Sequence, residues 1–286
     1  MGCDETDKPR RPQWLAVLNC VIAFAHFFVA LLVWYDKGDW KVALTTTFLD
    51  WRYPSDNDSS IAYHDDEIPI LVPVSVRLDL PRLSLTSLVF IFHILSGLWQ
   101  FLVFAVVPMR RFYHAELEKN RNALRWIEYA VTAPCMIIVI AVLMGQSDAV
   151  ILFLLQWSTF TLMLLGLLTE RLRNKNKNRG LSHAIGWIIH FTTWLCITFT
   201  FFYSMYGGTH RPPVRFRPLL YGTFFGMQTL FGCFGIVQLV SVVSPRISFY
   251  TIEASYAVLS LVSKITLGVL VWQFIKVRDD LGIRMI

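Results

Sequence analysis

Lys264 stands in the middle of an apolar stretch, LSLVSKITLGVLVW, which covers residues 259–272. At about 1.5 Å per helical residue, its stem is too short to carry the charge to water at either end. A charge at the middle of a bilayer costs at least ~2.5 kcal/mol, so such a lysine predicts a functional role and a partner. One reaction open to a buried lysine amine is Schiff-base formation with an aldehyde.

The best partner for this lysine is Glu128, in the stretch RWIEYA near the start of the third apolar span. A Lys–Glu pair between two spans lowers the cost of burying both charges. One interpretation is a structural ion pair that fixes helix packing. The other is covalent, with the carboxylate neutralising a protonated imine, and a lysine in the last of seven spans with a carboxylate in the third favours retinal.

The elements that must position these two residues are membrane helices. Of the 286 residues, 55% are hydrophobic and only 16% are charged, which is too apolar for an ordinary soluble domain. Stretches of about 20 apolar residues are long enough to cross a bilayer. We expect an all-α membrane protein, a single retinal-binding domain over residues 1–286, with seven spans at about 14–35, 83–107, 126–145, 149–169, 184–206, 219–243 and 250–275.

Basic side chains concentrate in two short connections, residues 108–125 and 170–180. Positive charge in short loops marks the cytoplasmic side, so we expect the N-terminus inside and the C-terminus outside. The net charge of +6 therefore reflects membrane orientation and gives no reason to expect nucleic acid as a partner. The expected location is the lipid of the plasma membrane.

The long first outer loop, residues 36–82, contains two stretches with strand character. VSVRLDL, from Val74 to Leu80, alternates apolar and polar residues, and KVALTTTF, from Lys41 to Phe48, is β-branched. We expect a β-hairpin on the outer face, whose exposed edge could form a homodimer contact. A solvated loop without a partner is the alternative.

Two modification signals accompany these elements. Gly2 and Thr6 match the myristoylation pattern, and Cys3 could take a second acyl chain. Asn57 begins a glycosylation sequon in the outer loop. Both signals are short patterns that also occur by chance.

Three residues share the helical face of Lys264: Ser260, Tyr256 and Glu253. Ser260 is placed to hydrogen-bond near the lysine nitrogen, and Tyr256 to border the same space. Glu253 lies three turns away, where it is either an interfacial residue or part of a proton path.

Together RWIEYA and EASYAVLSLVSK, residues 125–130 and 253–264, resemble the heliorhodopsins, as do the cytoplasmic N-terminus and the long first outer loop. The resemblance covers essentially all seven spans. It implies that Lys264 carries all-trans-retinal, that Glu128 is the counterion and that Ser260 lies beside the Schiff base. It also implies a polar, proton-accepting cluster on the cytoplasmic side of the chromophore, which would include His26 and His93. To this cluster we add Arg125, which shares a helical face with Glu128. Without the resemblance, each histidine would be interpreted as a helix-packing residue.

A polyene pocket should be rich in aromatic and sulphur-containing side chains, which spans three, four and six supply. The candidates are Thr132, Met136, Gln156, Trp157, Phe160, Met163, Phe231, Phe234 and Gln238.

Pumping is not favoured, because proton-pumping microbial rhodopsins have a second carboxylate eleven residues after the counterion, where this chain has Val139. The resemblance implies light sensing with a slow photocycle and an unidentified cytoplasmic signalling partner. A light-gated passive proton channel is the first alternative, and a seven-span receptor or transporter without chromophore is the second. Neither an enzyme nor a metal site is expected, since no nucleophile elbow, phosphate loop or metal-spaced His/Cys set is present.

Overall fold

The structure, a computed structural model, describes residues 13–35, 38–52, 70–172, 179–207, 211–244 and 246–283. The acylation pattern at Gly2, Cys3 and Thr6 and the sequon at Asn57 lie outside these residues.

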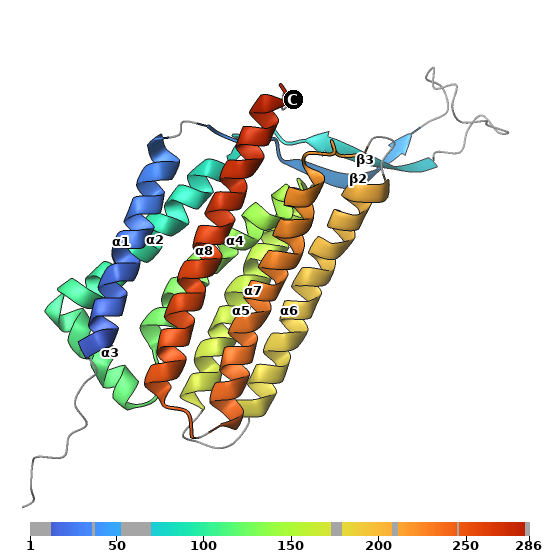
Figure 1. The fold of residues 1–286 in the computed structure, drawn as a ribbon. Helices are drawn as coiled ribbons and strands as arrows, with labels where there is room; N and C mark the ends of the chain where they lie inside the picture. The colour runs from blue at the N-terminus through green and yellow to red at the C-terminus, as the bar shows by residue number, and fades with distance from the viewer. Residues whose placement is uncertain are drawn as a thin grey trace, which may run out of the picture.

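Seven helices of the described chain are long and apolar enough to cross a membrane, which confirms the predicted fold class. They run side by side in one bundle (Figure 1). Their bounds are α1 Gln13–Tyr35, α2 Leu85–Ala105, α4 Ala123–Leu143, α5 Ala149–Arg171, α6 Arg179–Phe202, α7 Arg217–Val243 and α8 Phe249–Asp280. The last helix is longer than expected, and α6 continues into a π-helical turn, Tyr203–Gly207.

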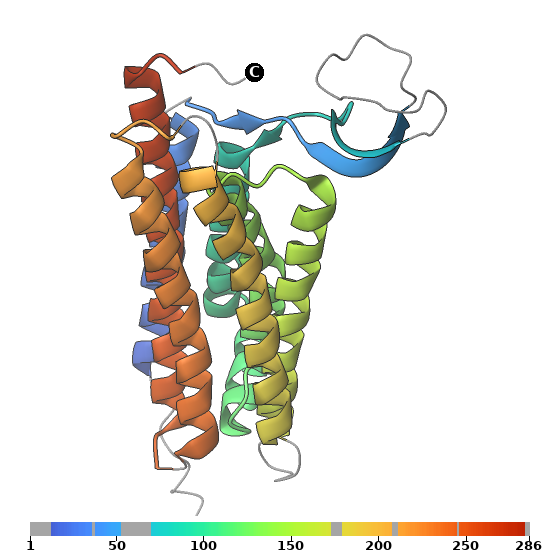
Figure 2. The ribbon, with the colours of Figure 1, turned by 90° about the vertical axis from the view of Figure 1, so that its right-hand side faces the viewer.

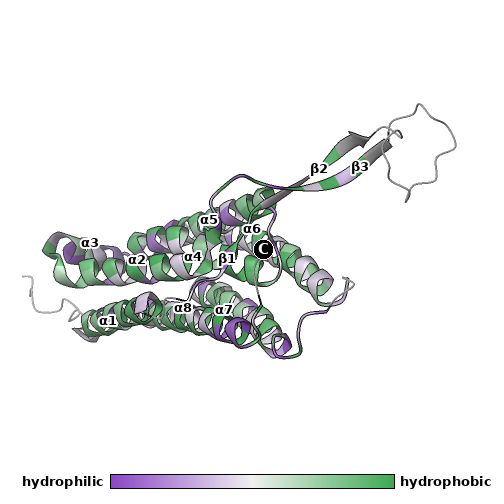
Figure 3. Ribbon diagram, turned by 90° about the horizontal axis from the view of Figure 1, so that it is seen from above, coloured by the Kyte–Doolittle hydropathy of each residue, from purple (hydrophilic) through white to green (hydrophobic). Residues whose placement is uncertain are grey.

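The outer faces of the bundle are apolar, as a lipid-facing surface requires. On α1, Phe24 and Phe28 are exposed, and the same holds for Ile188 and Phe191 on α6. Seen from above in Figure 3, most of the ribbon of the helices is coloured as hydrophobic. Helix α4 is the exception, because 72% of its span is buried against 44% for α8, the next highest. Residues of α4 are therefore best placed to contact several helices at once.

Short polar side chains fix where the central helices begin. Asn122 accepts a hydrogen bond from the backbone N–H of Arg125 and caps α4. Asp148 caps α5, and Ser248 caps α8. Such caps satisfy backbone donors that the first helical turn leaves unpaired. The cap on α4 sets the position of Glu128, six residues later in the sequence.

A β-hairpin lies at the end of the bundle that carries the C-terminus, as predicted. Strand β2, Thr45–Arg52, pairs antiparallel with β3, Ile70–Arg77, with Thr45 opposite Arg77. The hairpin projects sideways beyond the helices (Figure 2). Its strands differ from the predicted 41–48 and 74–80, because Lys41–Val42 (β1) pairs instead with Leu83–Ser84 (β4). A backbone hydrogen bond from Thr45 to Ser147 then fastens the start of β2 to the α4–α5 connection.

Helix α3, Val107–Glu118, lies at the opposite end of the bundle and connects α2 to α4 (Figure 1). It is amphipathic: Tyr113, Glu116 and Leu117 are buried, whereas Arg110 and Arg111 are exposed. These two ends of the molecule are called the hairpin end and the α3 end below.

Candidate functional site

Lys264 is buried within the bundle, with 2% of its surface exposed. Its Nζ atom donates hydrogen bonds to Oε1 of Glu128 at 2.5 Å and to Oγ of Ser96 at 2.6 Å. The Ser96 hydroxyl in turn donates to the same carboxylate oxygen at 2.6 Å. Helices α2, α4 and α8 thus bring together one cation, one anion and one hydroxyl, and the charges are neutralised where water is excluded.

This arrangement engages only one of the two carboxylate oxygens of Glu128. No described residue is a hydrogen-bond partner of its Oε2 atom, although that atom is buried. On the other side of the amine, the ring centroid of Tyr129 lies 5.4 Å from Nζ, where the face of an aromatic ring attracts a cation. The Tyr129 hydroxyl is held in place because it donates to the backbone carbonyl of Tyr256 at 3.0 Å.

His26 and His93 form a buried pair, and their Nδ1 atoms lie 3.0 Å apart. Both imidazoles lie within electrostatic range of Lys264. Nε2 of His93 packs against Gly268, one turn beyond Lys264 on α8 toward the hairpin end, where a Cβ atom would lie 3.2 Å from it. The pair is therefore beside the lysine and displaced toward the hairpin end. In the orientation expected from the charge pattern this is the outer side, which corrects the cytoplasmic position that the resemblance implies.

Arg125 does not join this pair, so the predicted cluster of three is corrected. Its guanidinium donates to Glu253 and to Glu170, and all three side chains are buried at the α3 end. Asn122 donates a further hydrogen bond to Glu253 at 2.7 Å. The reason is helix direction: Arg125 lies one turn before Glu128, so it points to the α3 end, where α5 contributes Glu170.

Tyr256 belongs to the same arginine cluster and not to the surroundings of the lysine amine. Its ring centroid lies 4.0 Å from the Arg125 guanidinium carbon, a cation–π contact. Glu253 is buried and ion-paired, which corrects its interpretation as an interfacial residue. Whether it serves a proton path stays a prediction.

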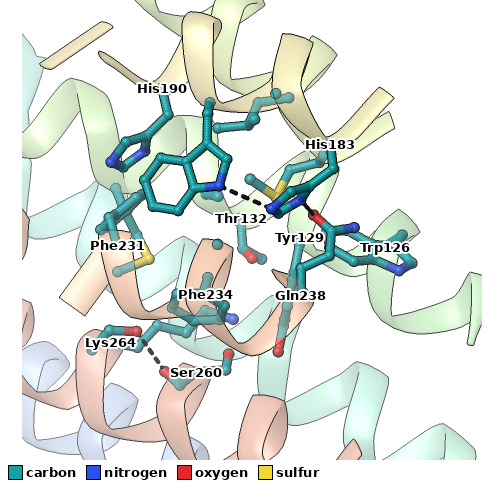
Figure 4. A pocket seen from close by; sticks show the side chains of 18 residues that line it. Trp126, Tyr129, Thr132, His183, His190, Phe231, Phe234, Gln238, Ser260 and Lys264 are labelled. Atoms are coloured by element: carbon teal, nitrogen blue, oxygen red, sulfur yellow. Dashed lines mark hydrogen bonds between the residues drawn. The ribbon is translucent and has the colours of Figure 1, made fainter. Parts of the chain in front are cut away.

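A cavity opens beside Lys264 and extends toward α6 and α7 (Figure 4). Its walls come from α4, α5, α6, α7 and α8, and part of it is continuous with the surroundings. Predicted residues that line it are Thr132, Met136, Met163, Phe231, Phe234, Gln238, Ser260 and Lys264. Further lining residues that sequence reasoning missed are Trp126, Tyr129, His183, Gly186, Trp187, His190 and Gly235.

Three predicted pocket residues on α5 have to be corrected. Gln156 and Trp157 are exposed on the outside of the bundle, and Phe160 contacts Trp157 there, with 5.2 Å between the ring centroids. The inward face of α5 is instead formed by Leu155 and Thr159, both buried. Hydrophobicity did not reveal this rotation, because a lipid-facing helix surface is as apolar as the interior.

Beyond the histidine pair, the hairpin half of the bundle is apolar where α4 packs against α8. Val139 and Ile140 of α4 pack with Leu267, Val271 and Phe274 of α8 in one buried cluster. Among the described residues, no group of three or more His, Cys, Asp or Glu side chains could hold a metal ion.

The site residues that sequence reasoning missed differ in how clearly the sequence indicates them. Ser96 follows His93 by one turn on α2, so the shared face could have identified it. Glu170 stands at the end of a span, within the basic stretch TERLRNKNK. Such a position is typical of a charged side chain in a solvated loop. The burial of Glu170 depends on the contact between α4 and α5, which spacing alone does not predict.

The residues present fit a polyene aldehyde such as retinal. The lysine amine borders the cavity, and the orphaned Oε2 of Glu128 can accept a hydrogen bond. The walls are aromatic, and Gly235 leaves room for the Trp187 ring, because a Cβ at residue 235 would lie 2.7 Å from it. Lys264 would hold the group covalently, and Phe231, Phe234 and Trp187 would enclose its chain.

Comparison with known proteins agrees with this geometry. A sequence model described as heliorhodopsin matches residues 15–276. No curated protein matches the chain.

Among solved structures, the chain is similar to the light-driven proton pump rhodopsin of Coccomyxa subellipsoidea, with a TM-score of 0.57 and 14% identity over 91% of this chain and 95% of that one. A cyanorhodopsin from the cyanobacterium Tolypothrix gives a TM-score of 0.49 and 16% identity, over 65% and 77% of the two chains. A light-driven proton pump from Leptosphaeria maculans gives 0.48 and 11%, over 94% and 93%.

The likeness to the Coccomyxa protein shows a shared fold, and the family is shown by the sequence model, which covers most of the chain. The chain therefore belongs to the heliorhodopsin family, a family of rhodopsins rather than a class of enzymes, and this membership implies a retinal chromophore.

Proposed function

We propose that this heliorhodopsin is a light sensor in which Lys264 carries all-trans-retinal and Glu128 is the counterion. The observation that carries the proposal is the contact of the buried Lys264 amine with Glu128 and Ser96 at the edge of an aromatic cavity. Retinal bound to this amine as a Schiff base would supply visible-light absorption and isomerisation of a double bond.

The protein's own residues control the proton at the lysine nitrogen. Glu128 holds it by charge, and Ser96 bridges the nitrogen and the carboxylate. If the nitrogen moves away from Oε1, the unpartnered Oε2 of the same carboxylate is an alternative acceptor. The His26–His93 pair offers a second one, since a neutral imidazole has one free nitrogen lone pair.

The apolar hairpin half of the bundle favours a proton transfer within the site over proton transport across the membrane. Beyond the histidine pair, Val139, Ile140 and Phe274 are each at most 1% exposed. A proton leaving the lysine nitrogen in this direction would have to cross side chains without donors or acceptors. At the α3 end, Arg125 fixes Glu170 and Glu253 in ion pairs, which disfavours a freely exchanging proton release group there.

We place the α3 end in the cytoplasm of a cell with this protein in its plasma membrane. Arg110, Arg111 and Lys119 lie at this end, and positive charge in short connections marks the cytoplasmic side. The exposed face of α3, with Arg110, Arg111 and Phe112, is the surface we assign to a signalling partner.

We also propose a homodimer formed through the β2–β3 hairpin. The hairpin projects from the bundle, β3 has no strand partner on its outer edge among the described residues, and Phe48 and Leu49 are 47% and 61% exposed. Phe48→Asp together with Leu49→Asp should shift the detergent-solubilised protein to the monomer mass in light scattering. A wild-type protein that is already monomeric would exclude this dimer.

The test of the chromophore site is an absorption spectrum of the protein reconstituted with all-trans-retinal. We expect a visible band that disappears in Lys264→Ala and shifts to the red in Glu128→Gln, because the counterion stabilises the ground-state cation more than the excited state. Lys276→Ala is the matched control, since that lysine is exposed on the same helix and should leave the band unchanged. A colourless wild-type protein would mean that Lys264 and Glu128 form only a structural ion pair that fixes helix packing.

Photocurrent under voltage clamp separates the sensor from the alternatives. We expect no sustained current at any membrane potential. A current that reverses with the proton gradient would establish a passive channel, and a current that flows without a gradient would establish a pump.

A further inference from the structure

His190 lies on the cavity wall that α6 contributes, and 9% of its surface is exposed. Its neighbours are aromatic: its ring centroid lies 5.3 Å from that of Trp187 and 6.3 Å from that of Trp194. Among the described residues, its imidazole has ring contacts but no hydrogen-bond partner. Because no described residue engages its nitrogens, the imidazole can form a hydrogen bond with a group that enters the cavity.

The other polar residues of this wall are already paired. His183 lies two turns earlier on α6, and its Nε2 accepts a hydrogen bond from Trp187 at 2.9 Å. Its Nδ1 is therefore the protonated nitrogen and donates to Oε1 of Gln238 at 3.3 Å. The Gln238 amide donates to the backbone carbonyl of Gly166 at 3.1 Å. His190 thus differs from His183 in having both nitrogens available.

Lys264 and His190 are on opposite sides of the cavity. Figure 4 shows the lysine on α8 at one side and His190 on α6 at the other, with Phe231 near the histidine. A chain attached at the lysine would present its free end toward α6. The ring of unmodified retinal is a hydrocarbon and would leave the imidazole without a partner, whereas a ring hydroxyl would supply one.

We propose that His190 recognises a hydroxyl group on the ring of the bound retinoid, so that a ring-hydroxylated retinal is the preferred ligand. This inference rests on the proposed function, since it requires a retinoid on Lys264. A neutral imidazole suits a hydroxyl because it has one donor and one acceptor nitrogen and the hydroxyl has both functions. A site that contains an unpaired polar group discriminates against the analogue that lacks the matching group.

The test is a competition between equal amounts of all-trans-retinal and all-trans-retinal with one ring hydroxyl, followed by extraction and chromatography of the bound retinoid. We expect the wild type to retain the hydroxylated form in roughly three- to tenfold excess, the range of one neutral hydrogen bond. In His190→Phe the ratio should fall to about one, while a visible band with unmodified retinal persists. His190→Asn should keep part of the preference.

Phe199→Leu is the matched control, because this side chain is 68% exposed on the outside of α6 and should leave the ratio unchanged. Equal uptake of both retinoids by a coloured wild type would overturn the inference and leave the proposed function intact. An unchanged preference in His190→Phe would do the same. A wild type that is colourless with both retinoids, like Lys264→Ala, would overturn the proposed function and this inference together.

Discussion

Two buried ionic clusters share helices α4 and α8 but differ in charge balance and in what surrounds them. In the first, Lys264 faces Glu128 and Ser96, and one carboxylate oxygen has no partner among the described residues. In the second, Arg125 is held between Glu170 and Glu253. The first borders the aromatic cavity, whereas the Arg125 guanidinium is covered by the rings of Trp126 and Tyr256.

The difference indicates why one cluster is suited to chemistry and the other to structure. A lysine amine can lose its proton and form a covalent bond, but a guanidinium stays charged in proteins. The lysine cluster also has a free acceptor and space beside it. The arginine cluster joins α4, α5 and α8 through several hydrogen bonds and is closed by aromatic side chains, so we expect it to hold the helices together.

The largest expected effect is the loss of stability in Arg125→Gln. Two buried carboxylates would face each other without a cation, and breaking a buried ion pair in this way costs about 3–5 kcal/mol. Lys264→Ala should cost less, about 1–3 kcal/mol, because Ser96 still donates to Glu128 and that carboxyl can take up a proton. Thermal unfolding of the retinal-free protein in detergent measures both.

Arg111→Gln is the surface control for this comparison, since Arg111 is exposed on α3 and its substitution should change stability by less than about 0.5 kcal/mol. Equal losses in Arg125→Gln and Lys264→Ala would contradict the assignment of different roles to the two clusters.

A smaller effect is expected for Ser96→Ala in the lysine cluster. The direct contact between Lys264 and Glu128 remains, so the variant should lose only the hydrogen bonds of the hydroxyl, about 1–2 kcal/mol. Its visible band should persist but shift, because the serine no longer shares the charge of the carboxylate. The spectrum and the melting curve of the same sample check both points, and an unshifted band would remove Ser96 from the chromophore site.

Features that depend on residue type and helical spacing could be predicted from the sequence. The seven spans, the hairpin and the fold class follow from apolar length and alternation, and the family model agrees with the resemblance carried by RWIEYA and its partner stretch. The cost of burying Lys264 demands a partner, and Glu128 is the carboxylate that the spans offer at a suitable depth.

Features that depend on how helices are rotated and paired could not be predicted. Gln156 and Trp157 turn outward although α5 is apolar on every side, and Glu170 turns inward although it stands at the end of its span. Sharing a helical face with Glu128 favours grouping Arg125 with the histidines, but a helix places residues 125 and 128 one turn apart along its axis. The partner of each buried charge therefore depends on which helix packs beside it, and composition does not identify that helix.

The smallest expected effect concerns Tyr113, which links α3 to the arginine cluster by a hydrogen bond of 3.4 Å from its hydroxyl to Glu253. Burial, together with the nearby Glu253 carboxylate, raises the pKa of Tyr113 well above its ordinary value. The phenol is thus protonated in the folded protein at pH values where it ionises in the unfolded chain. Because the folded state then binds more protons, this contribution to stability is complete below about pH 10 and is lost as the pH rises further.

In Tyr113→Phe this contribution disappears, so the melting temperature should fall less than that of the wild type between neutral pH and a pH above that of phenol ionisation. At neutral pH the variant should lose less than about 1 kcal/mol, since one long neutral-donor hydrogen bond is removed. Tyr35→Phe is the control, because that ring is 85% exposed at the end of α1. A parallel pH dependence in wild type and Tyr113→Phe would mean that α3 is not coupled to the arginine cluster through this phenol.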